Sequence, residues 1–154
     1  MTWTERVRVH WDHWDMTAWL ERPMPDAVLD RLREEPEAFQ IRFLEDVLAR
    51  LGEEADVLAQ LGHLYTQVGR NRDGLAVDRR LVTLRPRDPI AHYNLACSYA
   101  LLKQTSRAFA VLKKAVRLGY RDLDHMQQDP DLENLREDPR WNDLVGVIKP
   151  AEPS

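Results

Sequence analysis

Residues 61–65 read LGHLY and residues 95–99 read LACSY, so Leu, a small residue and Tyr return at the same spacing 34 positions later. Outward from this stretch, apolar residues recur every three or four positions, the period of a helix with one buried face. A fixed period of this length indicates a repeated unit of two packed helices. The paired positions are Leu61 with Leu95, Gly62 with Ala96, Tyr65 with Tyr99, Val68 with Leu102, Gly74 with Ala108, Ala76 with Ala110, Val77 with Val111, Leu81 with Ala115 and Leu84 with Leu118.

The expected helices are bounded by residues that start and stop helices. Three aspartates stand directly before a proline, an order that supplies an N-cap carboxylate and a proline at the first helical position. Three glycines follow apolar runs, where a left-handed residue ends a helix. Sustained alternation of apolar and polar residues is missing, so the sequence predicts an all-α fold. The pairs are Asp88-Pro89, Asp129-Pro130 and Asp138-Pro139, the glycines are Gly52, Gly69 and Gly119, and helices are expected over 55–68 and 72–84, then over 89–102 and 106–118.

The two units resemble the tetratricopeptide repeat family, whose pattern has Leu, Leu-Gly and Tyr on the first helix and Ala, an aromatic residue, Ala and Pro further on. The first unit departs from it at Asp78 and Leu81, and the second has Tyr120 where the closing proline is usual. The resemblance implies a short right-handed α-solenoid of helix pairs with a C-terminal helical cap. The matching residues are Leu58, Leu61, Gly62, Tyr65, Gly74 and Pro86, then Leu95, Ala96, Tyr99, Ala108, Leu112 and Ala115.

The regions outside the two units differ from them in pattern. Leu44 and Val47 fit the register of a second helix, which predicts a degenerate helical pair before the units. The segment after them resembles the closing segment of many bacterial repeat proteins, and its apolar residues would cover the last helix pair. The expected organisation is a Trp-rich, helical 1–20, the degenerate pair 21–54, the units 55–88 and 89–120, capping helices over 121–148 and a tail over 149–154.

In the family, the first helix of each pair lines a concave surface that binds an extended peptide or a partner helix. The alternative is that two units are too few for a groove and that the preceding segment fills it. A subclass binds acidic chaperone tails through Lys, Arg and Asn side chains, of which only Asn94 is matched, so that ligand is not expected. By the resemblance, the groove would be lined by Asp56, Ala59, Gln60, His63 and Gln67, then by Tyr93, Asn94, Cys97 and Leu101.

The N-terminal stretch HWDHWD, residues 10–15, raises the question of a metal site. His10 and His13 could share an ion with a neighbouring aspartate only at poor geometry, and a metal site needs three or four ligands. The tryptophans have a clearer role, because Trp11 and Trp14 lie on one helical stripe with Val7 and Ala18. We therefore predict no metal ligands here. The Trp11 and Trp14 face would either seal the first helices or form a docking surface.

The charges are distributed in blocks around a net charge of −4. Residues 70–87 carry six arginines and two aspartates, whereas residues 25–56 and 121–143 have net charges of −6 and −5. The arginine block lacks the stacking aromatic residues typical of nucleic-acid surfaces, and the acidic blocks would repel a polyanion. We expect these arginines to have an intramolecular role or to dock an acidic partner, and we do not expect nucleic-acid binding.

The sequence predicts a binding protein and not an enzyme. Phosphate-binding loops, nucleophile elbows and metalloprotease motifs are missing, and Cys97 has no adjacent basic pair to activate it. The single cysteine, the lack of an 18-residue apolar run and the lack of an apolar leader favour a cytoplasmic protein that does not enter membranes. We expect a scaffold or adaptor without cofactors that binds a protein or peptide. The alternative is a homodimer formed through the Trp-rich or terminal faces.

Overall fold

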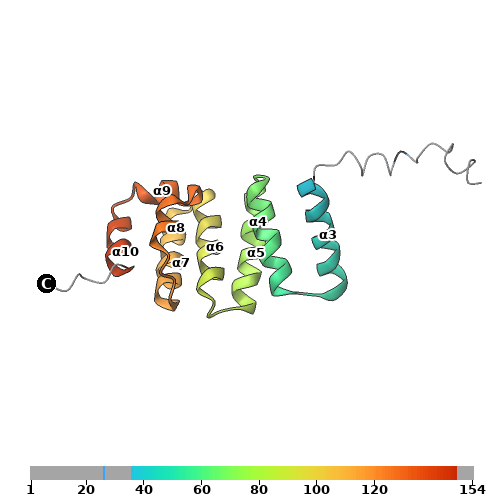
Figure 1. Ribbon diagram of the computed structural model, residues 1–154, viewed down its shortest axis with the longest axis horizontal. Coiled ribbons are helices and arrows are strands. Elements are labelled where there is room, and N and C mark those ends of the chain that lie inside the picture. Colours follow the sequence, from blue (N-terminus) through green and yellow to red (C-terminus); the bar gives the residue numbers. More distant parts are fainter. Residues whose placement is uncertain (1–25, 27–35, 149–154) are drawn as a thin grey trace, which may run out of the picture. The chain divides into compact units, whose positions relative to one another are not determined.

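The computed structural model describes residue 26 and residues 36–148, and the elements in this part of the chain are helices (Figure 1). The all-α class is therefore confirmed, since no β-strand occurs among the described residues. The chain divides into two compact units, Met1–Glu35 and Pro36–Ser154, and the helices from α3 to α10 belong to the second. The predicted helix over 1–20, with its Trp11 and Trp14 face, and the tail over 149–154 lie outside the described residues.

The helices of the two predicted units begin and end within one residue of the expected positions. The C-terminal segment consists of short helices. Among the described residues, no helix is long and apolar enough to cross a membrane. The elements are α3 Pro36–Leu51, α4 Ala55–Gln67, α5 Asn71–Leu84, α6 Pro89–Leu101, α7 Thr105–Leu118, α8 Leu123–Gln128, the 3₁₀ helix η1 Pro130–Leu132, α9 Glu133–Arg136 and α10 Arg140–Ile148.

Several helices begin or end at the capping residues that the sequence predicts. The Asp88 carboxylate accepts a hydrogen bond from the backbone N–H of Ile90 at 2.8 Å, at the start of α6. The Asp129 carboxylate caps η1 in the same way through the N–H of Asp131. Helix α7 ends at Gly119, whose φ of 114° lies in the left-handed region that favours glycine.

Consecutive helices pack against one another from α3 to α7. The first core joins α3, α4 and α5 through Ile41, Leu58, Leu61 and Leu81. Gly62 allows α4 and α5 to approach closely, because a Cβ atom at that position would lie 2.5 Å from an Asp78 carboxylate oxygen. A side chain at position 62 would therefore have to displace the Asp78 carboxylate.

The second core joins α6 and α7 to the C-terminal segment. Five apolar residues of this segment, Leu132, Leu135, Trp141, Leu144 and Val145, were expected to cover the last helix pair. All but the half-buried Val145 are fully buried against α6 and α7. The C-terminal segment is consequently part of the same core as α6, and it determines what surrounds that helix.

Candidate functional site

A cavity of about 230 Å³ lies where α4, α5 and α6 face the segment containing α8 and η1. The predicted first helices of both units contribute to it, as does the C-terminal segment. Most of the residues that line it carry a polar or ionisable side chain, and none of the described lining residues is a lysine or arginine. The lining side chains include those of His63 and Thr66 of α4, Asn94 and Cys97 of α6, and Asp129 and Asp131 of the C-terminal segment.

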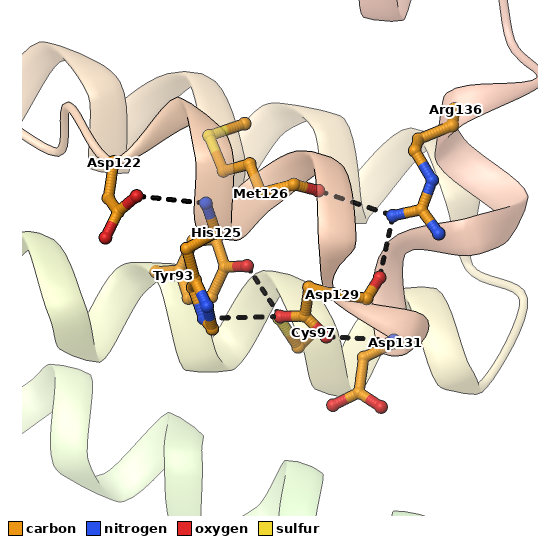
Figure 2. A network of polar contacts seen from close by, with 8 residues as sticks. All are labelled: Tyr93, Cys97, Asp122, His125, Met126, Asp129, Asp131 and Arg136. Atoms are coloured by element: carbon orange, nitrogen blue, oxygen red, sulfur yellow. Dashed lines mark hydrogen bonds and ion pairs between the residues drawn. The ribbon is translucent and has the colours of Figure 1, made fainter.

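Asp129 connects the C-terminal segment to α6 (Figure 2). Its Oδ2 atom accepts a hydrogen bond from the Tyr93 hydroxyl at 2.6 Å and lies 3.7 Å from the Cys97 Sγ. Its backbone carbonyl accepts a hydrogen bond at 2.7 Å from Arg136, which also donates to the carbonyl of Met126. The residue that caps η1 therefore also fastens this segment onto α6.

Tyr93 is held on its ring faces as well as at its hydroxyl. Its ring stacks on Tyr120 with centroids 4.4 Å apart and planes 4° from parallel, and the His125 ring lies 5.5 Å away. Burial, first, and then the neighbouring acidic groups raise the pKa of Tyr93 far above its usual value. The phenol is therefore protonated and acts as a hydrogen-bond donor to Asp129.

Asp78 contributes a buried carboxyl group to the cavity lining. Its side chain is 3% exposed, and its Oδ2 atom accepts a hydrogen bond from the Ser98 hydroxyl at 2.6 Å. Burial raises the pKa of Asp78 to about 6, against the opposing effect of the Ser98 hydrogen bond. This pair joins α5 to α6 beside the close approach at Gly62.

The structure brings together four of the nine predicted groove residues at the cavity: His63, Tyr93, Asn94 and Cys97. The others do not line it. Asp56, Gln60 and Gln67 are exposed on α4, while Ala59 and Leu101 are half-buried. Asp56 instead accepts a hydrogen bond from Arg85 at 2.8 Å.

The expected exposure of Tyr93 and Cys97 is wrong. They are only 4% and 7% exposed, because Tyr120, His125 and Asp129 lie over this part of α6. The side of α6 that carries Tyr93 and Cys97 is thus largely covered by Tyr120 and the C-terminal segment. His63 is exposed and Asn94 is half-buried, so these two offer the accessible polar groups of the predicted set.

Sequence reasoning missed the acidic residues of the cavity, Asp78, Asp129 and Asp131, and also Thr66 and His125. The sequence marks Asp129 only as a helix cap. The repeat period could not place it opposite Tyr93, because the C-terminal segment lies outside the repeat. For Asp78 a signal existed, since it departs from the aromatic residue usual in the family pattern.

The described residues contain one group with donor atoms close enough for a metal ion. The Cys97 thiol and the carboxylates of Asp129 and Asp131 lie within 4.8 Å of one another. Both oxygens of Asp129 already accept hydrogen bonds, from Tyr93 and from the Asp131 N–H. Burial, first, and then the two aspartates raise the pKa of Cys97 well above its usual value, so without a bound ion the thiol keeps its proton. The two hydrogen bonds to Asp129 favour a structural contact between the C-terminal segment and α6 over a metal centre.

Part of the arginine block has the intramolecular role that the sequence allowed. Arg70 pairs with Asp73 at 2.7 Å and its guanidinium lies 4.5 Å from the Tyr65 ring centroid. Arg80 pairs with Glu53 at 2.7 Å, in the connection between α3 and α4. The Arg70–Tyr65, Arg80–Glu53 and Arg85–Asp56 contacts thus connect α5 and its first turn to α4 and to the residues before it.

The comparisons with known proteins are sparse. No family model and no solved structure matches the chain. A 56-residue stretch is 38% identical to a chloroplastic protein from Arabidopsis thaliana. The match covers 36% of this chain and 17% of the plant protein, so the two share one limited segment.

Proposed function

We propose that the chain is a non-catalytic protein–protein interaction module of the tetratricopeptide-repeat type, which binds an extended peptide or partner helix across α4 and α6. The 34-residue self-match and the consecutive packing of paired helices support the repeat assignment. The observation that carries the binding proposal is the cavity of about 230 Å³, where side chains from both predicted first helices meet. His63 and Asn94 are the accessible polar contacts among the predicted groove residues that line it.

The chemistry of the cavity supports binding more than catalysis. The Cys97 thiol is protonated and buried, and its neighbour Asp129 is an acid engaged by Tyr93. A nucleophilic cysteine requires a lowered pKa and a partner that stabilises the thiolate. The pKa of the Cys97 thiol is raised instead, and its neighbour is a carboxylate, which would destabilise a thiolate. We therefore assign this thiol a packing role.

A capture experiment with matched asparagine variants tests the proposal. The full chain would be immobilised beside Asn94→Ala and Asn142→Ala, the second changing an exposed asparagine on α10 outside the cavity. We expect specific partners to be recovered by the wild type and by Asn142→Ala and to be lost with Asn94→Ala. His63→Ala should show the same loss. Equal recovery by all four proteins, each checked for helicity, would contradict binding at the cavity.

Self-association is the second candidate function, and a stripe on α3 favours it. Phe39, Phe43 and Leu51 are 52%, 58% and 70% exposed, while Ile41 on the same helix is buried against α4. Exposed apolar surface of this kind invites association. Light scattering of the full chain at several concentrations would show a dimer that Phe43→Glu dissociates. A wild-type protein that stays monomeric at every concentration rules out this candidate.

A further inference from the structure

We propose that the cavity takes a cationic side chain, lysine or arginine, presented by the partner polypeptide. This inference rests on the proposed function, since it assumes that a polypeptide binds across α4 and α6. It goes further by stating which chemistry the partner must carry at that point.

The charge of the lining carries the argument. Three carboxyl groups line the cavity, from Asp78, Asp129 and Asp131. Among the described residues, no lysine or arginine side chain lies within 4.0 Å of the Asp129 or Asp131 carboxylates, and the one basic group so placed is His125 at 3.7 Å from Asp129. The Arg136 guanidinium reaches the backbone carbonyl of Asp129 and forms no ion pair with these carboxylates. Carboxylates in a partly buried site that lack a paired lysine or arginine favour a positively charged ligand.

Asp131 is the best placed of these acids to meet a ligand. Asp129 is engaged by Tyr93, and Asp78 is buried against Ser98. The Asp131 side chain is half-buried at the cavity and next to His63 on the facing helix. Burial and the adjacent Asp129 raise its pKa, which reflects unfavourable negative charge that a bound cation would relieve.

The lining combines apolar and polar surface, and a lysine or arginine side chain can use both. Such side chains place an aliphatic stem on apolar surface and direct the charged end to polar groups. Asn94 and Thr66, both half-buried, add polar groups to the lining beside the carboxylates. The surrounding block, residues 121–143, has a net charge of −5 and would attract a basic segment from a distance.

A random peptide library selected on the full chain tests the inference. We expect the selected peptides to share a lysine or arginine, and replacement of that residue by Gln to weaken binding at least about tenfold, the scale of a charged hydrogen bond. Asp131→Asn should cause a similar loss, whereas Asp143→Asn, an exposed acid on α10, should cause none. The charges can also be exchanged: a peptide whose lysine or arginine is replaced by Glu should bind the wild type poorly and bind the Asp131→Lys variant again.

The outcomes separate this inference from the proposed function. Selected peptides without a common basic residue, lost on Asn94→Ala but unaffected by Asp131→Asn, would overturn the cationic ligand and leave the binding site intact. Failure to select any peptide, or selected peptides unaffected by both changes, would overturn the inference together with the proposed site.

Discussion

Helices α3 and α6 differ in how many of their side chains are buried: α6 buries even polar residues, whereas α3 leaves aromatic residues exposed. Helix α6 has eight buried residues among its 13, including the polar His92 and Ser98. Helix α3 has one buried residue among 16, and its Phe39 and Phe43 are exposed. The difference arises from neighbours, because α6 packs against α5, α7 and η1, whereas among the described residues α3 packs mainly on α4. Burial in a stack of helices therefore depends on which elements flank each helix.

Each of the two helices takes part in a tyrosine–carboxylate contact, and the two contacts differ in burial. The Tyr65 hydroxyl donates to Glu45 of α3 at 2.5 Å, and the Tyr93 hydroxyl of α6 donates to Asp129 at 2.6 Å. The Glu45 side chain is 42% exposed, whereas that of Asp129 is 10% exposed. The carboxylate of the α6 contact is thus less accessible to water than that of the α3 contact, and the α6 contact lies at the candidate site.

The largest expected loss of stability concerns the C-terminal segment that packs on α6. Leu132 is fully buried, so Leu132→Ala should lower the free energy of unfolding by about 2–5 kcal/mol through lost burial and a residual cavity. Leu51→Ala at the end of α3 removes a side chain that is 70% exposed, and it should change the free energy by less than about 0.5 kcal/mol. Urea denaturation measures both. Similar losses for the two would break the comparison.

The buried carboxyl of Asp78 predicts a dependence of stability on pH. Its pKa is raised from 3.8 to about 6 in the folded protein, so the folded state binds this proton more tightly than the unfolded chain. As pH rises through this interval, stability should fall by up to about 3 kcal/mol from this group, and the loss should be complete above about pH 6.

Asp78→Asn tests this dependence, because the variant has no charge to bury and keeps an acceptor for Ser98. The difference in unfolding free energy between wild type and variant should shift in favour of the wild type as pH falls from about 7 to about 4. An NMR titration giving Asp78 a pKa near 3.8 would contradict the account.

The two tyrosine contacts give the third comparison. Tyr93→Phe leaves the mostly buried Asp129 without its phenol donor and should cost about 1–3 kcal/mol. Tyr65→Phe should cost less, because water can replace the hydroxyl at the more exposed Glu45. Thermal and urea unfolding of the two variants measures the order. An equal or reversed order would show that burial of the acceptor does not determine the cost.

Glycines at the two ends give the smallest expected effects. Gly52 follows α3 with a φ of 87°, so Gly52→Ala forces a side chain into left-handed backbone and should cost about 1 kcal/mol. Gly146 lies within α10 with open space around its Cβ position, so Gly146→Ala should stabilise the protein by about 0.5–1 kcal/mol. Melting temperatures should move in opposite directions, and a shared direction would argue against these backbone assignments.

The helices were predictable because their signals are local. Asp88 caps α6 and Gly119 ends α7 as the sequence indicated. The 34-residue period located buried positions such as Leu61 and Leu81, but two of the apolar positions that it paired, Val68 and Leu84, are exposed. The candidate site was predictable only in part. The register identified His63 and Asn94, but it left Tyr93 exposed, because the contact with Asp129 joins a repeat to a non-repeating segment 36 residues away.

The central claim is that a polypeptide binds at the α6 end, in the cavity beside Asp131. Amide chemical shifts of the ¹⁵N-labelled full chain, measured while a selected lysine- or arginine-containing peptide is added, test it most directly. The account predicts shifts concentrated at His63, Asn94 and Asp131, with Phe39 and Phe43 of α3 unchanged. Shifts concentrated along α3, with the cavity residues unchanged, would contradict it.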